Sequence, residues 1–418
     1  MKRFPWGHAA HPQWAMAVDL TVAQLCARMA LPGYARAPTL GLIYITDHYA
    51  AHAKPILQRL ASKLPSGIRW TGTTGMGVCA TDTQYWDEPA LSVMLCDLPH
   101  DQYRVYSGLA PFPRPDWFHT QMALVHADGG APDLSDLLDD MAKITECGYL
   151  FGGLAASRTG DAPQFAWTEQ VHNRWQGGPR SVFSGGLSGV AFGPGVTLAS
   201  RVAQACQPIA PERLITAAAD NLVLTLDGQP ALDVLIRDLG LDLTRPHQAL
   251  TVLRETLAGL ANPGEDGVCR TGDFGPGVRV RRLIGVDAQR RAVAVGDTVS
   301  SGQRLAFCRR TAQAAHNSLV RICAEIREAL EARTALINDG AETGDVRGAG
   351  GPRILGAHYV GCAAPGCAPG AELHTIRQVL GEVPLTGFFA DGAIAYRYLY
   401  GHAGVLTVFA ESTAGAAA

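Results

Sequence analysis

Hydrophobic and polar positions along the chain follow a distinct order that begins near residue 39. Residues 39–46 (TLGLIYIT) form a short β-branched run typical of a buried strand, and residues 52–64 (HAKPILQRLASKL) carry apolar side chains at helical spacing. The Gly- and Thr-rich segment RWTGTTGMGV follows, and residues 91–98 (LSVMLCDL) supply another apolar strand. The order strand, helix, Gly-rich element, strand predicts a β-α-β-β repeat.

The same order returns twice further along the chain. Residues 121–193 contain the strand QMALVHAD, the helix LSDLLDDMAKI, the Gly-rich segment YLFGGLAAS and the closing strand GGLSGVAFG. Residues 354–410 contain ILGAHYVGC, AELHTIRQVLG, PLTGFFADGAIAY and GVLTVFA in that order. Three aligned copies predict a mixed α/β fold in which repeated β-α-β-β units form one or two sheets. A generic α/β chain with a coincidental order is the alternative.

A different pattern separates the second copy from the third. Residues 214–240 read as a strand, a tight Asp227-Gly228 turn and a helix, and Asp-Gly is a strong hairpin signal. Residues 277–310 alternate apolar and polar positions with period two, which predicts an inserted antiparallel β region. Residues 312–334 place apolar side chains on one face and predict a long amphipathic helix.

Composition and charge exclude several classes of protein. The 418 residues are 47% hydrophobic and 17% charged, which excludes a disordered chain. The net charge is −3 and no block of Lys and Arg occurs, so nucleic acid and anionic membrane surfaces are not expected as main partners. No apolar run reaches about 18 residues, so membrane insertion is not expected. Ten cysteines without a dense framework, and no signal peptide, favour a cytoplasmic protein.

Taken in order, five segments resemble a FIST protein (F-box and intracellular signal transduction): RWTGTTGMGV, FGGLAAS, GGLSGVAFGPGV, TAAADNLVLTLDGQPAL and PLTGFFADGAIAY. We expect an N-terminal FIST domain at 39–210, a C-terminal FIST domain at 211–411, an N-terminal extension at 1–38 and a disordered tail at 412–418. The resemblance implies a bacterial, cytoplasmic sensory module that binds a small ligand such as an amino acid. It also implies a separate signalling partner, such as a histidine kinase. Some bacterial members resemble haem proteins that sense nitric oxide, so the cofactor is left open.

Two segments differ from the family pattern. The family often has an acidic residue in a Gly-Glu-Ile-Gly segment, which reads Gly392-Ala393-Ile394-Ala395 here. The family turn Cys-x-Gly-Arg-Gly is replaced after Cys362 by Ala-Ala-Pro-Gly-Cys. An acidic side chain and an arginine of the family are therefore missing from this chain.

The Gly-rich segments supply the candidate ligand-binding residues. Loops at strand ends of open α/β sheets offer free backbone amides, and the hydroxyls of Thr73 and Thr74 would add to them. Arg158 and Asp391 occupy equivalent turns of two copies and would suit the two charges of an amino acid, or else be solvated or paired with each other. The alternative role of the glycines is close strand packing. The candidate set is Thr73, Thr74, Gly75, Gly153, Arg158, Cys362, Asp391 and Tyr396.

Cys362 and Cys367 are open to three interpretations. They would bind zinc if His358 and His374 completed a tetrahedral set, and they would form a disulfide under oxidation. The third interpretation is a pair of buried thiols. No metal site is predicted, because His358 lies in a strand and His374 in a helix.

Haem and enzyme chemistry have little direct support in the sequence. A non-covalent haem needs an axial histidine, and the candidates near predicted strand ends are His48, His126, His358 and His402. No nucleophile, base and orienting group occur together, so no catalytic residue is predicted. A haem-binding gas sensor and a non-sensing interaction scaffold are therefore the alternatives to a sensor of small ligands.

Overall fold

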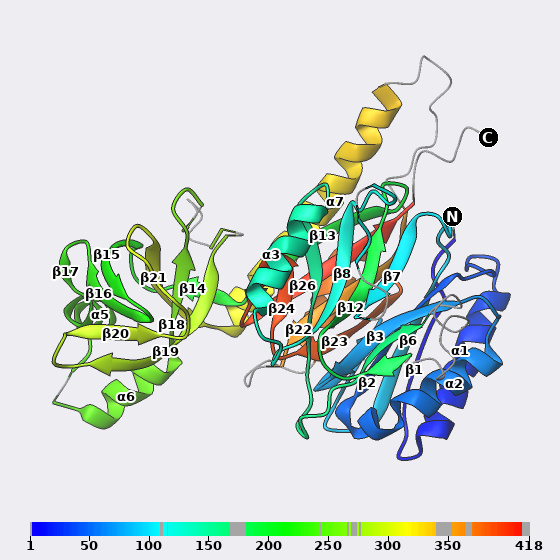
Figure 1. Cartoon of the computed structure of the whole chain (residues 1–418), viewed down its shortest axis with the longest axis horizontal. Coiled ribbons are helices and arrows are strands. Elements are labelled where there is room, and N and C mark those ends of the chain that lie inside the picture. The colour runs from blue at the N-terminus through cyan, green and yellow to red at the C-terminus, as the bar shows by residue number, and fades with distance from the viewer. Residues whose placement is uncertain are drawn as a thin grey trace. The chain divides into compact units, whose positions relative to one another are not determined.

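The computed structural model describes residues 2–108, 112–114, 116–167, 181–242, 244–265, 267–268, 274–275, 277–339, 353–363 and 370–411. The chain divides into two compact units, whose elements are labelled in Figure 1. Unit 1 comprises Met1–Ala203, Leu319–Leu399 and Ala403–Ala418, and unit 2 comprises Gln204–Ser318 and Tyr400–His402. The tail expected at 412–418 lies outside the described residues.

Unit 1 is built from three six-stranded sheets. The first sheet has the order β1 (Trp6–Ala10), β6 (Ala90–Cys96), β2 (Leu40–Thr46), β3 (Arg69–Gly75), β10 (Gln164–Trp167), β11 (Val182–Phe183). The second has the order β7 (Tyr103–Ser107), β12 (Leu187–Phe192), β8 (Met122–Asp128), β9 (Tyr149–Ala155), β24 (Ala393–Tyr396), β25 (Tyr398–Tyr400). The third has the order β13 (Thr197–Gln204), β26 (Ala403–Ala410), β22 (Ile354–Cys362), β23 (Leu385–Ala390), β4 (Gly77–Ala80), β5 (Thr83–Trp86).

The predicted mixed α/β fold with three β-α-β-β repeats is confirmed. At the centre of each sheet lies a parallel pair, β2–β3, β8–β9 or β22–β23, and the closing strand β6, β12 or β26 pairs antiparallel with the first strand. A glycine occupies the same register in all three pairs: Gly72, Gly152 and Gly387. A Cβ atom there would lie 1.7–1.9 Å from a carbonyl oxygen of the neighbouring strand, so only glycine fits.

The chain forms four sheets where one or two were expected. The reason is that each repeat lends a strand pair to the sheet of another repeat. β4–β5 of the first repeat joins the third sheet, β10–β11 of the second joins the first sheet, and β24–β25 of the third joins the second sheet. Because this exchange is cyclic, no repeat completes a sheet alone.

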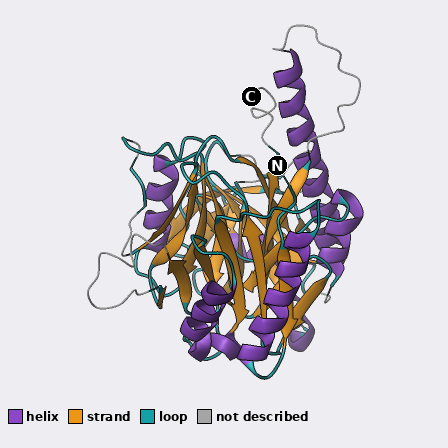
Figure 2. Cartoon of the chain, turned by 90° about the vertical axis from the view of Figure 1, so that its right-hand side faces the viewer, coloured by secondary structure: helices purple, strands orange, loops and turns teal. Residues whose placement is uncertain are grey.

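Helices cover the outer faces of the three sheets, as Figure 2 shows. They are α1 (Trp14–Ala30), η1 (Asp47–His52) and α2 (Ala53–Lys63) on the first sheet, α3 (Leu134–Ile144) on the second, and α7 (Ala312–Asp339) and α8 (Ala371–Leu380) on the third. The long helix predicted at 312–334 is confirmed and continues to Asp339. None of the described helices has the length and apolar character needed to cross a membrane.

Unit 2 contains the predicted antiparallel region. Its strands are β14 (Cys206–Pro208), β15 (Arg213–Ala219), β16 (Leu222–Leu226), β17 (Gln229–Pro230), β18 (Thr256–Ala261), β19 (Arg279–Asp287), β20 (Ala292–Val295) and β21 (Arg304–Arg310), with helices α5 (Ala231–Leu239) and α6 (Pro246–Glu255). Pairing of β21 with both β15 and β18 closes the sheet into a barrel. Asp227 and Gly228 both have positive φ, which confirms the predicted hairpin turn.

Candidate functional site

The inner faces of the three sheets meet in the interior of unit 1, and each sheet contributes a large polar side chain. Tyr44, His126 and His358 lie on β2, β8 and β22 and are fully buried. The Tyr44 hydroxyl is hydrogen-bonded to His126 Nε2 at 3.1 Å, and the rings of Tyr44 and His358 have centroids 5.2 Å apart. The expectation that His358 lies near a strand end is wrong, because it occupies the middle of β22, whereas His126 lies two residues before the end of β8.

The two interior histidines are held neutral by their surroundings. Burial lowers the pKa of His358 to about 3, and burial together with His358 lowers the pKa of His126. Neither ring nitrogen of His358, nor Nδ1 of His126, has a hydrogen-bond partner among the described residues. Burial also raises the pKa of Tyr44, so its phenol keeps its proton. The interior is therefore uncharged but contains polar atoms whose burial costs free energy.

Other polar side chains cross the interior from sheet to sheet in pairs. Ser92 of the first sheet and Thr386 of the third are hydrogen-bonded at 2.7 Å. Ser188 of the second sheet donates to Gln164 Oε1 of the first, also at 2.7 Å. These pairs fix the position of one sheet against another, because a displacement would leave buried hydroxyls without partners.

The carboxyl ends of the parallel strands meet at one end of unit 1, where several predicted site residues come together. Backbone hydrogen bonds join the sheets there, including Ala156 N to Thr74 O at 3.0 Å. A Cβ atom on Gly75 would lie 3.0 Å from Phe388 Cβ, and one on Gly153 would lie 2.7 Å from a methyl of Val360. These glycines thus allow strands of different sheets to approach closely.

The polar residues predicted at this end have protein partners. Thr73 and Thr74 are buried, and the Thr74 hydroxyl donates to Pro163 O at 3.0 Å. The Arg158 backbone and guanidinium donate to Asp47 at 2.8–2.9 Å, and the guanidinium also pairs with Asp87. Burial raises the pKa of the Asp47 carboxyl, but the hydrogen bonds from Arg158 outweigh it, so the net shift is downward. A ligand role for these residues stays a prediction.

Of the remaining predicted residues, Cys362 and Asp391 lie at this same end of unit 1, whereas Tyr396 pairs with Leu150 near the start of β9. Cys362 is buried at the end of β22, and Asp391 is exposed directly after β23. Tyr396 ends β24 and packs against Tyr149, with ring centroids 4.4 Å apart. Cys367 lies outside the described residues.

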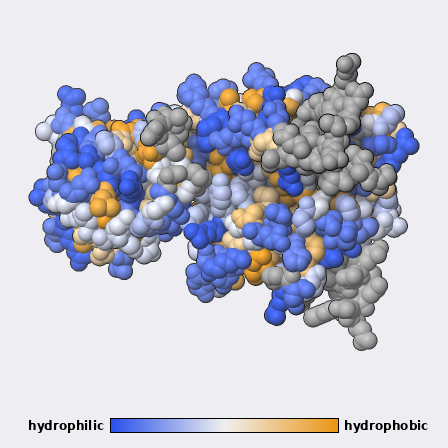
Figure 3. All heavy atoms as spheres, turned by 90° about the horizontal axis from the view of Figure 1, so that it is seen from above, coloured by the Kyte–Doolittle hydropathy of each residue, from blue (hydrophilic) through white to orange (hydrophobic). Residues whose placement is uncertain are grey.

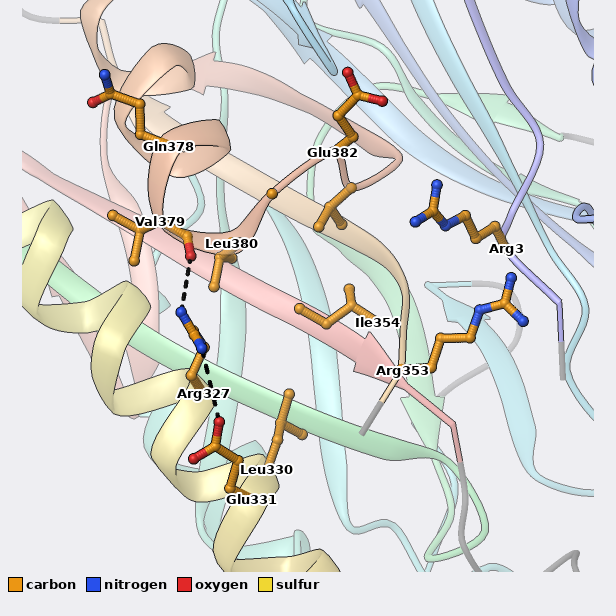
Figure 4. Close-up of a pocket in the computed structure, with 12 residues that line it drawn as sticks. Arg3, Arg327, Leu330, Glu331, Arg353, Ile354, Gln378, Val379, Leu380 and Glu382 are labelled. Atoms are coloured by element: carbon orange, nitrogen blue, oxygen red, sulfur yellow. Dashed lines mark hydrogen bonds and ion pairs between the residues drawn. The ribbon is translucent and has the colours of Figure 1, made fainter. Parts of the chain in front are cut away.

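A separate pocket of about 580 Å³ opens on the outer side of the third sheet. The N-terminal segment, α7, the start of β22 and the turn from α8 to β23 form its wall (Figure 4). Leu330, Ile354, Val379, Leu380 and Val383 are its apolar part. Its charged side chains are Arg3, Arg327, Glu331, Arg353 and Glu382. The pocket thus combines an apolar wall with charges of both signs.

Two arginines of the pocket have no partner among the described side chains and backbone. Arg3 and Arg353 make neither an ion pair nor a side-chain hydrogen bond there, whereas Arg327 lies 4.0 Å from Glu331 and donates to Val379 O at 3.5 Å. Glu382 accepts from Arg377 at 2.6 Å. The positive charge of Arg3 and Arg353 is therefore unopposed.

Sequence reasoning missed this pocket. Its arginines come from the N-terminal extension, the solvent-facing side of a helix and a residue just before a strand, and no local pattern connects them. The available signal was weak: Arg327 lies on the helix whose apolar face was correctly identified.

Haem fits neither the interior of unit 1 around His358 nor the pocket on the outer side of the third sheet. Tyr44, Phe151 and Phe388 enclose His358 with ring centroids 5.2–6.4 Å from the imidazole, which leaves no slot for a macrocycle. No His, Cys, Met or Tyr lines the pocket, so it offers no axial ligand of those types. In the part of the chain that the structure describes, no three His, Cys, Asp or Glu side chains are placed to hold a metal ion.

The described surface gives little support to the alternative that this protein is a non-sensing interaction scaffold. On the face seen in Figure 3, most of the described surface is hydrophilic and the apolar residues form small separate groups. The large apolar side chains exposed in the described chain are spread over several elements: Met16, Leu20, Leu31, Trp117, Leu137, Ile209, Leu214, Leu250, Ile284 and Val286. A docking surface would be expected to concentrate them.

The fold defines a class of α/β protein in which three repeats exchange strands around a common interior and an antiparallel barrel is inserted before the third repeat. The chain belongs to the FIST family: the FIST N domain matches residues 39–229 and the FIST C domain matches residues 231–396. FIST domains are generally sensory domains of signal transduction. The domain boundary expected after residue 210 stays a prediction.

Curated relatives come from mycobacteria. Uncharacterized protein Rv0628c of Mycobacterium tuberculosis is 30% identical over 236 residues, which cover 56% of each chain. Uncharacterized protein Mb0898c of Mycobacterium bovis is 29% identical over 221 residues, covering 51% of this chain and 49% of that protein. The chain thus spans about half the length of the curated relatives it matches.

Proposed function

We propose that this protein is a cytoplasmic sensory protein that binds a small, amino-acid-like ligand in the pocket beside α7 and α8 and signals to a separate protein, such as a histidine kinase. The observation that carries the proposal is the pocket itself. Its volume of about 580 Å³ falls within the range of small-molecule sites, and it combines an apolar wall with guanidinium and carboxylate groups. Arginine suits a ligand carboxylate, and glutamate suits an ammonium group.

The pocket is also well placed to transmit a signal. Arg327, Leu330 and Glu331 lie on α7, which begins in unit 2 and from Leu319 onward belongs to unit 1. A ligand that binds more tightly to one placement of α7 than to another would shift the helix toward the placement it prefers, by the difference between the two affinities. The output would then reach a partner through the surface that α7 and its neighbours present.

Ligand-induced stabilisation of the full chain tests this proposal. A ligand at about 100 times its dissociation constant stabilises the folded state by about 2.7 kcal/mol, which thermal unfolding detects. We expect members of a set of free amino acids to raise the melting temperature of the wild type but not of Arg327→Ala. Arg333→Ala is the matched control, because Arg333 is exposed on the same helix and does not line the pocket. The proposal fails if no amino acid stabilises the wild type, or if Arg327→Ala responds as the wild type does.

A further inference from the structure

The unopposed positive charge of the pocket limits which ligands it can bind. Arg3 and Arg353 both line the pocket and lie on the side away from Arg327 (Figure 4). Neither guanidinium has an ion pair or a hydrogen bond with any described residue; Arg3 is half-buried and Arg353 is exposed, so the donors of both remain available to a ligand. Two like charges facing one cavity repel each other until an anion binds between or beside them.

The carboxylates of the pocket do not cancel this charge. Glu382 is bound to Arg377, which also donates to Asp82 at 2.9 Å. Glu331 lies on the same helix as Arg327 and only 4.0 Å from it, so these two charges largely balance each other. What remains for a ligand is the pair Arg3 and Arg353, with two positive charges.

We infer that the ligand carries two acidic groups and is an amino acid with an acidic side chain. The inference rests on the proposed function and narrows its ligand class. With Glu382 bound to Arg377 and Glu331 beside Arg327, two guanidiniums, those of Arg3 and Arg353, remain for a ligand. An amino dicarboxylate brings one carboxylate to each of them, whereas an amino acid with a neutral side chain would leave one guanidinium unmatched. The two carboxylates would bind Arg3 and Arg353, and the ammonium group would lie toward Glu331.

Pairs of ligands that differ only in one charge test this inference. Calorimetric titration of the full chain would compare L-glutamate with L-glutamine and L-aspartate with L-asparagine, since each amide has nearly the shape of its acid. A charge-assisted pair between guanidinium and carboxylate is worth a factor of about 10 to 100 in affinity. We therefore expect at least one acid to bind at least about 10-fold more tightly than its amide.

Substitution of the unpaired arginines locates the effect. Arg353→Gln and Arg3→Gln should each bring the acid-to-amide ratio close to one, whereas Arg333→Gln should keep the wild-type ratio. Thermal unfolding without ligand checks that each variant is folded, and both arginines lack structural partners among the described residues. If the ratio survives in Arg353→Gln and Arg3→Gln, the assignment of these residues is wrong.

The failure of this inference can be told apart from the failure of the proposed function. If amides bind as tightly as acids and Arg327→Ala abolishes both, the pocket binds amino acids and only the acidic ligand class is wrong. If no amino acid of either kind binds, the proposed function and this inference both fail.

Discussion

Acid should destabilise unit 1 through the interior histidine His358. The fully buried imidazole has a pKa lowered to about 3, whereas in the unfolded chain it takes up a proton near its ordinary pKa of about 6.5. The folded-state pKa is the lower one, so the unfolded state binds the extra proton between these values. The stability is therefore present above about pH 6.5 and is lost as the pH falls toward 3. Single-site linkage gives a loss of about 2 kcal/mol at about pH 5 relative to about pH 7.5.

Replacing His358 with leucine removes this proton uptake while roughly preserving side-chain volume. We expect the free energy of unfolding to fall by about 2 kcal/mol less in His358→Leu than in the wild type between about pH 7.5 and pH 5. Urea unfolding followed by tryptophan fluorescence is the assay, because all seven tryptophans lie before residue 176 and report on unit 1 alone. The lowered pKa of His126 adds to the pH dependence of both proteins, and its largest cause is burial, which the substitution leaves in place, whereas the smaller contribution from His358 is lost.

A surface histidine on the helix that covers the third sheet provides the control. His374 is exposed on α8, so His374→Gln should retain the wild-type pH dependence. If His358→Leu also retains it, the imidazole does not take up a proton on unfolding in this range, and the reasoning from its burial is refuted.

Two further predictions concern the end of unit 1 where the strands converge. Asp47→Asn should lower the free energy of unfolding by about 1–3 kcal/mol in the urea assay at neutral pH, because Arg158 loses a charged hydrogen-bond partner. The loss stays within this range because Arg158 is itself partly exposed. An unchanged unfolding midpoint would contradict this prediction. Gly153→Ala should cost about 1–3 kcal/mol by pushing a methyl group against Val360, whereas Gly33→Ala, with no atom within 4 Å of the added Cβ, should cost little. Equal effects of the two alanines would argue against close packing at Gly153.

Local patterns in the sequence were sufficient to predict the repeated strands and helices. The run TLGLIYIT is buried at every position of β2, and the apolar spacing of Ile56, Leu57 and Leu60 becomes the buried face of α2. Both signals depend on neighbours a few residues apart, which is the range over which periodicity is readable. The Asp227-Gly228 turn was readable for the same reason, because only a few residue types accept positive φ.

The number of sheets and the location of the pocket could not be read in this way. The strand pair β4–β5 follows β3 closely in the chain but pairs with β23, about 300 residues later, and nothing local specifies that partner. The pocket depends on the same kind of long-range arrangement, since Arg3 and Arg353 meet only because the third sheet brings their segments together. The predicted residues Gly75 and Gly153 were recognised as a related set, but the sequence could not tell a ligand loop from a close crossing of strands.

The pseudo-symmetry of unit 1 explains why the proposed site lies where it does. All three repeats contribute side chains to the interior of unit 1, and cross-sheet pairs such as Ser92–Thr386 fill it. The side chains of the interior therefore stabilise the fold. The third repeat alone has the barrel inserted before its first strand, and α7 comes with that insertion. α7 and α8 together cover the third sheet, and the pocket forms along their carboxyl-terminal parts. Two sheets thus carry a helix from outside their repeat, α1 on the first sheet and α7 on the third, and the pocket forms beside α7, where the third repeat differs from the other two.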